Sequence, residues 1–285
     1  MDLSEEQTNF ASILRLFKIF VKNGWTKHEL YESVLTNFSY LLMNLSETQR
    51  ELMLDLAGKY KWISLNEYSA RLTNVLRSIE NEKLNSCKRI IVFPIMKPED
   101  QNKIKSSHSI IYMIRGVKPF LDRYNNIEII ELLKYQDIHE DNFQPEENDI
   151  IFLVDDYLGS GETIETTLKI VLSNRKIPLE KLNIVTIASQ LDTIEVIKNW
   201  GIPVYYDYIS PKGISDEMEA DIANEKIKIM LEIEQIVPGS SLCSLGYNQS
   251  EALITLLRTP DNTFPIFWKD HRKKGKKFKA PFPRY

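Results

Sequence analysis

The sequence predicts an α/β fold in which a mainly parallel, Rossmann-like sheet is flanked by helices and is preceded by an all-helical accessory region. Short runs of branched apolar residues recur after residue 86 and are separated by helical patterns, as expected of βαβ units. Before that point the chain shows only helix starts and amphipathic stripes. The four clearest apolar runs are 89–96, 150–154, 182–189 and 204–209. Each is short enough to be a strand that is buried on both faces.

The first third of the chain contains repeated helix-start signals of the form Ser/Thr-x-x-Glu/Gln. In such a box the first side chain caps a free backbone N–H and the second reaches back to the capping residue. An amphipathic stripe follows each box, so we expect four helices that end near Glu82. The pairs are Ser4 and Gln7, Thr26 and Glu29, Ser46 and Gln49, and Ser64 and Glu67. We interpret these helices as an accessory region, and a partner-binding role stays open.

Composition places the chain among globular proteins without a membrane span. Its 285 residues are 43% hydrophobic and 27% charged, enough for one large domain or two modest ones. The two cysteines, Cys87 and Cys243, give neither a disulfide framework nor paired metal ligands, and we expect both to be reduced and buried. The acidic start of the chain is unlike a signal peptide, and no apolar run could cross a bilayer. We therefore expect a cytoplasmic protein without a membrane partner.

The stretch 150–163 carries the strongest chemical signal. Asp155 and Asp156 follow the apolar run 150–154, and a glycine-rich turn over 159–163 then leads into a helical pattern. Ligands of open α/β sheets bind outside the carboxyl ends of the strands. Small residues before a helix N-terminus present N–H groups and a positive dipole to an anion. This arrangement predicts a phosphorylated, hydroxyl-rich ligand together with a divalent metal.

Two common phosphate motifs do not fit this stretch. A P-loop requires Gly-Lys-Ser/Thr, but Gly161 is followed by Glu162. The dinucleotide fingerprint requires a third glycine, and Ile164 occupies that position. A third interpretation, a buried strand followed by a plain polar turn, stays open.

What remains resembles the ribose-phosphate signature of the type I phosphoribosyltransferases: an apolar strand, two acids, two variable residues and a small-residue loop that closes on Thr. In that family the acids hold the ribose hydroxyls of phosphoribosyl pyrophosphate (PRPP), and the loop cradles its 5′-phosphate. The resemblance implies that Asp155 and Asp156 are catalytic and orient the ribose, directly or through Mg²⁺. It assigns the phosphate to Gly159, Ser160, Gly161, Glu162 and Thr163. The chain departs from the family where Gly159 and Ser160 replace Thr-Thr and where Glu162 replaces a small residue.

The resemblance also implies a pyrophosphate-binding loop after the first strand of the domain. The segment 97–105 occupies that place and leads into a helix start, where hydroxyls, N–H groups and cations suit a diphosphate. The candidates are Lys103, Lys105, Ser106 and Ser107. A solvated basic loop with a serine cap is the alternative. We expect His108 to make a local hydrogen bond. The segment 137–148 stands where the family places a mobile lid, but it contains no Lys or Arg.

An aromatic segment between Leu242 and Trp268 resembles the closing part of phosphoribosyltransferase-like effectors of bacterial conflict systems, including retron-type antiphage operons. The resemblance extends over about 86–268 and places a nucleobase near this segment. The implied base-contacting or hood residues are Asn262, Thr263, Phe264 and Trp268. The alternative is that these aromatic residues only close the core.

The last residues form a cation run with interspersed aromatic side chains, from His271 to Tyr285. Such runs bind phosphate backbones and stack on bases, although many are simply solvated tails. We therefore name nucleic acid, or a complex of reverse transcriptase with nucleic acid, as candidate partners. The expected regions are a helical accessory region over 1–85, a phosphoribosyltransferase-like domain over 86–268 and a basic tail over 269–285.

These observations lead to one functional hypothesis with two alternatives. The chain is expected to bind PRPP or a nucleotide with Mg²⁺ and to transfer or cleave at ribose C1, as an antiphage effector. It could instead be a non-catalytic sensor of PRPP or a nucleotide, since the lid segment lacks cations. The third hypothesis is a nucleic-acid-associated conflict protein that docks through its tail. We also expect the protein to form an oligomer.

Overall fold

The computed structural model describes residues 3–216 and 219–284, which form two compact units. The central unit comprises residues 65–210. The terminal unit combines the two ends of the chain, 1–64 and 211–285. Each unit has a hydrophobic core of its own. The central unit is therefore inserted, in sequence, between the two halves of the terminal unit.

The central unit is built on a six-stranded sheet in which every pair of neighbouring strands is parallel. The strands run in the order β3-β2-β4-β5-β6, with β7 also pairing with β5. The predicted parallel sheet is thus confirmed, and the predicted apolar runs are its strands. Their bounds are β2 Arg89–Pro94, β3 Glu128–Glu131, β4 Asp149–Leu158, β5 Leu182–Gln190, β6 Val204–Tyr205 and β7 Tyr208–Ser210.

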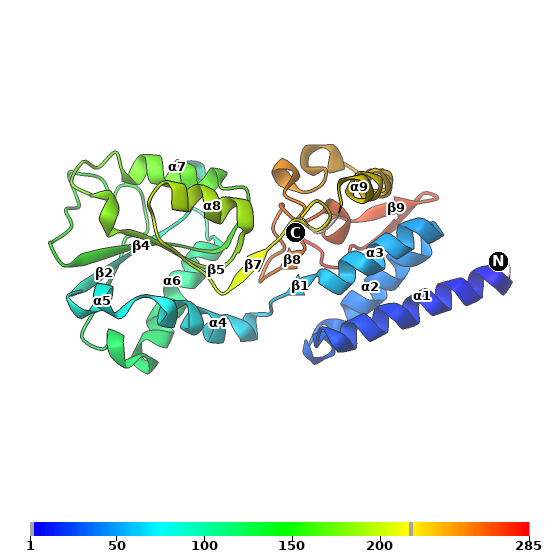
Figure 1. The fold of residues 1–285 in the computed structure, drawn as a ribbon, viewed down its shortest axis with the longest axis horizontal. Helices are drawn as coiled ribbons and strands as arrows, with labels where there is room; N and C mark the ends of the chain where they lie inside the picture. The colour runs from blue at the N-terminus through cyan, green and yellow to red at the C-terminus, as the bar shows by residue number, and fades with distance from the viewer. Residues whose placement is uncertain (1–2, 217–218, 285) are drawn as a thin grey trace. The chain divides into compact units, whose positions relative to one another are not determined.

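Helices cover both faces of this sheet. In Figure 1, α7 and α8 lie on one face, while α4 and α6 lie on the other. Alternate residues of β4 point to opposite faces, so Ile151 and Leu153 pack with Ile164 and Leu168 of α7 in one core. The helices are α4 Leu65–Ser78, α5 Asn81–Asn85, α6 Ser106–Val117, α7 Glu162–Val171 and α8 Leu191–Asn199.

The strand order contains a point at which the direction of winding reverses. From β2 the chain goes to the edge strand β3, then returns to the other side of β2 and continues through β4, β5 and β6. Numbered from the first strand, this is the 2-1-3-4-5 order of doubly wound sheets. Such sheets bind ligands outside the carboxyl ends of the two strands on either side of the reversal. Here these are β2 and β4.

The terminal unit is mainly helical, and its core is rich in aromatic side chains. Tyr60 stacks on Phe282 with ring centroids 4.8 Å apart, and Trp25 meets Phe20 edge to face. Its helices are α1 Leu3–Lys22, α2 Tyr31–Met43, α3 Glu47–Lys59 and α9 Ala220–Glu234. Its strands are β1 Lys61–Trp62, parallel to β8 Ile254–Thr255, and the antiparallel pair β9 His271–Lys273 and β10 Lys276–Phe278.

Short 3₁₀ helices connect elements in both units. They are Trp25–Lys27, Pro98–Asp100, Lys118–Phe120, Asp122–Tyr124, Leu179–Lys181, Ser240–Cys243, Tyr247–Gln249 and Pro265–Phe267. Thr26 lies inside the first of these, so the box of Thr26 and Glu29 does not begin an α-helix. The box of Ser46 and Gln49 is present with both reciprocal hydrogen bonds and begins α3.

These units do not coincide with the regions 1–85, 86–268 and 269–285 expected from the sequence. The apolar stripe of α4, including Leu72 and Val75, is buried in the central unit, whereas α1–α3 share a core with residues 211–285. An amphipathic stripe shows that a helix is buried but not against what, so the sequence could not assign α4.

Residues 269–284 are not a solvated tail. They form the β9–β10 hairpin and then enter the core of the terminal unit, where Ala280 and Phe282 are buried. The side chains of Arg272, Lys273, Lys274, Lys276, Lys277 and Lys279 are nevertheless exposed, whereas His271 is buried. The buried side chains of Pro281 and Phe282 hold the segment in the core. These two apolar residues are visible in the sequence, but the many cations around them favoured the interpretation as a tail.

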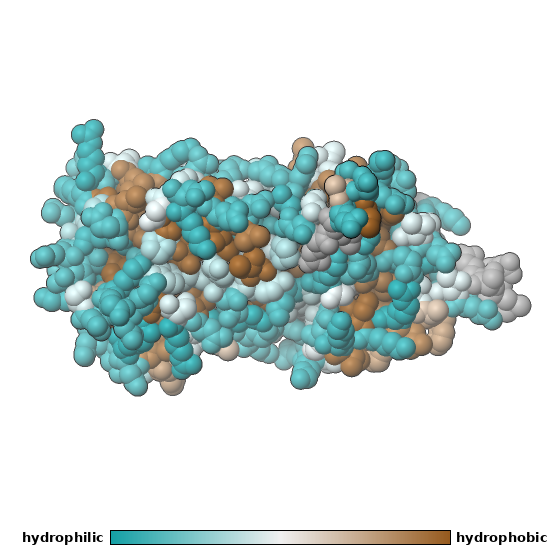
Figure 2. Space-filling view, in the orientation of Figure 1, coloured by the Kyte–Doolittle hydropathy of each residue, from teal (hydrophilic) through white to brown (hydrophobic). Residues whose placement is uncertain are grey.

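Apolar side chains also reach the surface. Phe10, Leu14, Phe17 and Val21 of α1 are exposed along one side of the helix, and Figure 2 shows hydrophobic residues gathered among a largely hydrophilic surface. In the part of the chain that the structure describes, every helix is too short or too polar to span a bilayer.

Candidate functional site

The two aspartates lie side by side at the carboxyl end of β4, next to the reversal of the sheet. Asp156 is only 6% exposed, and its Oδ2 accepts a hydrogen bond of 2.9 Å from the hydroxyl of Tyr68 on α4. Asp155 is half-buried, and its Oδ1 accepts from the hydroxyl of Ser106 at 2.8 Å. The same oxygen accepts from the backbone N–H of Asp156 at 2.9 Å. Both carboxylates are therefore held in fixed positions.

Neither carboxylate makes an ion pair with a cationic side chain among those the structure shows. Burial, and the neighbouring charge of Asp156, hold the pKa of Asp155 well above its usual range. Burial also raises the pKa of Asp156, although the hydroxyls of Ser106 and Tyr68 oppose this shift. Two like charges have been brought together in a poorly solvated place. A bound cation would relieve this cost, and perturbed groups of this kind concentrate at functional sites.

The turn after β4 leads directly into the N-terminus of α7. Gly161 precedes the helix with φ of 84°, a left-handed conformation that side chains with a Cβ rarely adopt. The hydroxyl of Thr193, in the first turn of α8, donates a hydrogen bond to the carbonyl of Gly159 and so holds the turn in place. The first N–H groups of a helix have no partner within it and carry positive dipole. The structure thus presents 159–163 as a rigid, anion-compatible turn, with the side chain of Ser160 exposed.

Lys97 is a cation at this turn that the sequence alone did not identify. Its Nζ lies 2.7 Å from Oε1 of Glu162, the first residue of α7. The hydroxyl of Thr167 bonds to the backbone of Met96 and so ties the segment after β2 to α7. Lys97 offsets the negative charge that Glu162 brings to the turn 159–163. The pairing depends on two segments far apart in sequence, which no local pattern reveals.

The four residues expected to hold pyrophosphate have different surroundings. Lys103 and Lys105 both pair with Asp100, at 2.7 and 2.8 Å, and the bond from Lys103 is the main reason that the pKa of Asp100 is lowered. Ser106 contacts Asp155, as described above. Ser107 is 0% exposed, and its hydroxyl has no hydrogen-bond partner in the structure. Only Ser106 reaches the acid pair.

His108 makes the local hydrogen bond expected of it, since its Nδ1 accepts from the N–H of Lys105 at 3.2 Å. Burial lowers the pKa of His108, which favours the neutral ring that this acceptor role needs. The bond closes the first turn of α6.

The loop that stands in the place of the family lid is fastened to the central unit. Asn174 donates to the carbonyls of Ile138 and Phe143, at 2.9 and 3.0 Å, and Ile138 is buried. Asp137 accepts from the backbone N–H groups of Leu133 and Lys134. This segment is therefore held by several bonds to its own unit.

The residues expected to contact a base belong to the terminal unit, where local hydrogen bonds engage their polar atoms. Asn262 donates to the hydroxyl of Ser250 at 2.8 Å, and Thr263 donates to the carbonyl of Ile254 at 2.8 Å. Trp268 donates its indole N–H to the carbonyl of Thr263. Phe264 is buried in the core of this unit. The role of these four residues toward a base stays a prediction.

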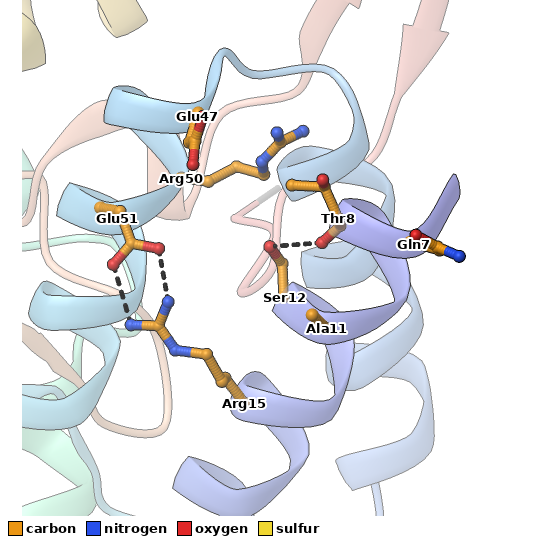
Figure 3. A pocket seen from close by; sticks show the side chains of 8 residues that line it. All are labelled: Gln7, Thr8, Ala11, Ser12, Arg15, Glu47, Arg50 and Glu51. Carbon is orange, nitrogen blue, oxygen red and sulfur yellow. Dashed lines mark hydrogen bonds and ion pairs between the residues drawn. The ribbon is translucent and has the colours of Figure 1, made fainter. Parts of the chain in front are cut away.

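The terminal unit also has an open pocket of about 460 Å³ between α1 and α3. Figure 3 shows Ser12 and the ion pair of Arg15 with Glu51 among the residues that line it. Arg50 also lines it and donates to Asn9 Oδ1 at 2.9 Å. This pocket contains neither of the two aspartates.

The donor set at the acid pair fits Mg²⁺ in the way that nucleotide-binding proteins commonly hold it. Mg²⁺ is often bound by one or two carboxylates, with water and substrate phosphates completing its coordination. Asp155 and Asp156 would supply two hard oxygen ligands, and because burial raises the pKa of both, a bound cation would favour their ionised forms. Among the described residues, no cluster of three or more His, Cys, Asp or Glu could hold a metal without such help.

Comparison of the sequence with family models gives a match to PRTase-CE over residues 31–284. The chain belongs to the PRTase-CE family. The expected membership of a phosphoribosyltransferase-like family is thereby confirmed, and the parallel α/β sheet of the central unit agrees with it. The match begins after α1, so this helix lies outside the part of the chain that the PRTase-CE model describes.

Several solved structures are similar to this PRTase-CE protein at low identity. An APRTase from Giardia lamblia complexed with 9-deazaadenine is 9% identical, with 51% of this chain and 78% of that chain covered and a TM-score of 0.32. A hypothetical protein from Neisseria gonorrhoeae with bound ppGpp is 13% identical, with 58% and 95% covered and a TM-score of 0.31. The AQ2163 protein from Aquifex aeolicus is 12% identical, with 65% and 86% covered and a TM-score of 0.32. No match was found among the curated proteins.

Proposed function

We propose that the central unit binds PRPP or a nucleotide together with Mg²⁺ and transfers or cleaves at ribose C1. The observation that supports this most strongly is the acid pair Asp155 and Asp156, which lies a few residues before the turn 159–163. Both features belong to β4 and its following helix, beside the reversal of the sheet where doubly wound folds bind ligands. Carboxylates can accept from ribose hydroxyls, and the turn can donate N–H groups to the 5′-phosphate.

In the proposed reaction the bond between C1 and the pyrophosphate oxygen breaks, and the acceptor or water forms the new bond to C1. Asp155 and Asp156 orient the ribose, and the turn 159–163 anchors the phosphate at the far end of the sugar. Binding energy from this remote phosphate then helps to position the reacting centre. Asp155 and Asp156 would hold Mg²⁺, which would neutralise negative charge at the site.

Thermal unfolding with PRPP and Mg²⁺ tests the binding proposal. A ligand present at about 100 times its dissociation constant adds roughly 2.7 kcal/mol to the free energy of unfolding. We expect the melting temperature to rise in the native protein but not in Ser160→Asp, because a carboxylate in the turn repels the phosphate. Ser173→Asp is the matched control, since Ser173 is exposed just beyond the opposite end of α7. Loss of the rise in melting temperature in both variants would contradict the assignment. The absence of a rise in the native protein would contradict it as well.

Release of pyrophosphate from PRPP, measured with pooled nucleobases, then separates a transferase from a sensor. The sensor is favoured by one observation, the pairing of Lys103 and Lys105 with Asp100, which engages the expected pyrophosphate cations. Binding without release would support that alternative. Release that disappears in Asp155→Asn would support the enzyme.

The role as an antiphage effector belongs to the same proposal and rests on the family. If the protein depletes nucleotides, we expect its induced expression to arrest bacterial growth, and Asp155→Asn to abolish the arrest. Growth arrest by both proteins would separate toxicity from the proposed site.

Docking on nucleic acid is a second candidate function, favoured by the exposed cations of the β9–β10 hairpin. The exposed basic residues are Arg272, Lys273, Lys274, Lys276, Lys277 and Lys279. Binding to single-stranded RNA or DNA should weaken steeply as salt rises, because cations that neutralise phosphates release counterions. Replacing Lys274 and Lys276 by Gln should reduce both the affinity and the salt dependence. Unchanged binding would exclude the hairpin as the contact.

A further inference from the structure

Helix α4 contributes a residue to the acid pair although it comes before the strands of the sheet in the chain. Tyr68 lies in the first turn of this helix and is 0% exposed. Its hydroxyl donates to Oδ2 of Asp156 at 2.9 Å. A buried carboxylate needs hydrogen-bond donors to stay ionised and in one orientation. No such role follows from the ribose-phosphate motif, which ends at Thr163.

Independent contacts fix α4 at this position. Arg71, less than one turn after Tyr68, pairs with Glu67 at 2.7 Å and with Asp207 between β6 and β7. Asn74 donates to the other oxygen of Asp207 at 3.2 Å. The helix also packs on β5, β6 and α6. Tyr68 is thus presented to Asp156 from a helix that is attached to the sheet at several points.

The two aspartates are consequently supported from different elements. The half-buried Asp155 accepts from the hydroxyl of Ser106 at the start of α6, and Ser106 also acts on Asp156. The buried Asp156 has a further donor on α4, the hydroxyl of Tyr68. Only the support from α6 lies within the segment where the family resemblance placed ligand-binding residues.

We propose that Tyr68 is a positioning residue of the ligand site and that it acts by fixing the carboxylate of Asp156. This inference rests on the proposed function. Removing the hydroxyl frees Asp156 to turn away from the ribose and its metal, while the phosphate turn 159–163 is left intact. Affinity for PRPP with Mg²⁺ therefore falls, and affinity for inorganic phosphate does not.

Tyr68→Phe tests this proposal, with Tyr124→Phe as the matched control. Tyr124 is also buried in the central unit, and its hydroxyl donates at 2.6 Å to the carbonyl of Leu76, on the same helix α4. Both variants remove one buried hydroxyl that contacts or belongs to α4, but only Tyr68 contacts an aspartate. The dissociation constants of PRPP with Mg²⁺ and of inorganic phosphate are measured by thermal shift, beside the melting temperature without ligand.

We expect Tyr68→Phe to weaken binding of PRPP by about tenfold or more, as for a hydrogen bond to a charged group. Binding of phosphate should stay within about twofold for the same variant, because the turn keeps its own supports. Tyr124→Phe should lower the melting temperature without changing either affinity. Equal losses of PRPP affinity in the two variants, or unchanged PRPP binding in Tyr68→Phe, would overturn the role of Tyr68 alone. Absence of any PRPP response in the native protein would overturn the proposed function and this inference with it.

Discussion

Strand β4 carries aspartates at both of its ends, and the partners of these aspartates differ between the two ends. At the start, Asp149 has a fully buried side chain and accepts two hydrogen bonds from Arg89, at 2.9 and 2.6 Å. At the end, Asp155 and Asp156 receive hydroxyl donors but no cation. Burial alone would raise the pKa of Asp149, but the bonds from Arg89 and from the Glu146 N–H lower it overall. The pKa values of Asp155 and Asp156 are raised.

The difference separates a carboxylate with a structural role from two carboxylates that we propose to bind a ligand. Asp149 is neutralised inside the protein, so its charge contributes to folding. The charges of Asp155 and Asp156 are left uncompensated and are available to a ligand or metal. Burial by itself therefore does not distinguish the two cases, whereas the presence of a cationic partner does.

The largest effect is expected at the start of the strand. Asp149→Asn should destabilise the protein by about 3 kcal/mol at pH 7, because it breaks a largely buried pair and leaves Arg89 without its main partner. Urea unfolding measures this difference. Since the folded pKa of Asp149 is lowered, its contribution is present above the unfolded value of about 3.9 and is lost as the pH falls through the folded value. The gap between native protein and variant should therefore close in acid. A gap that is constant with pH would contradict the ionic origin.

A smaller effect, on ligand binding, is expected from Lys97→Met. This variant removes the cation that pairs with Glu162 in the turn 159–163, so PRPP should bind about tenfold more weakly. Lys103→Met is the control, because Lys103 is exposed and pairs with Asp100. Titration calorimetry of both variants decides between them. A greater loss in Lys103→Met would return the pyrophosphate contact to the segment 97–105.

Asp155→Asn should change the free energy of unfolding in the opposite direction to Asp149→Asn. Because the folded pKa of Asp155 is raised, the folded state loses stability as the pH rises from the unfolded value through the folded one. The variant cannot lose a proton and avoids this loss. We expect it to be more stable than the native protein by about 1 kcal/mol at pH 7, with no advantage in acid, although it does not bind PRPP with Mg²⁺. A destabilised Asp155→Asn would show that this end of β4 is structural as well.

The smallest effect concerns the charge that Glu162 adds to the turn. Glu162→Gln removes a carboxylate from the turn 159–163 and ends its ion pair with Lys97, so inorganic phosphate should bind about threefold more tightly. The change should shrink at high salt. Glu165→Gln, one turn later on α7, is the control, because Glu165 already pairs with Lys169 at 2.6 Å. Equal changes in both variants would mean that only net charge matters.

Much of the fold was predictable because its signals are local. The runs 89–96 and 182–189 are apolar enough to be strands buried on both faces, and the glycines before α7 mark the turn at the end of β4. General rules for parallel sheets limit the possible orders of the strands once the strands are known, but they do not fix one. The acid pair and the turn 159–163 could be named as candidates for the same reason, since all of their residues lie within one short stretch.

The parts that the sequence did not provide depend on contacts between distant segments. Tyr68 and Asp156 are separated by 88 residues, and Lys97 and Glu162 by 65. The stripe of α4 showed that the helix is buried, but not that it joins the sheet. The pairing of Lys103 and Lys105 with Asp100 was not expected from the sequence, because Asp100 reaches both lysines only when the loop has its folded shape.

The interrupted layout of the terminal unit also sets an order of events during synthesis. The central unit is complete once residue 210 has emerged from the ribosome, whereas the terminal unit still lacks α9 and strand β8. Helices α1–α3 must therefore wait with an incomplete core until the last residues arrive. Because domains generally fold as they are completed, the central unit should form first. Strands β1 and β8, which lie before and after the central unit in the sequence, then pair. Because the central unit between them is already folded, the effective loop that must be ordered is shorter.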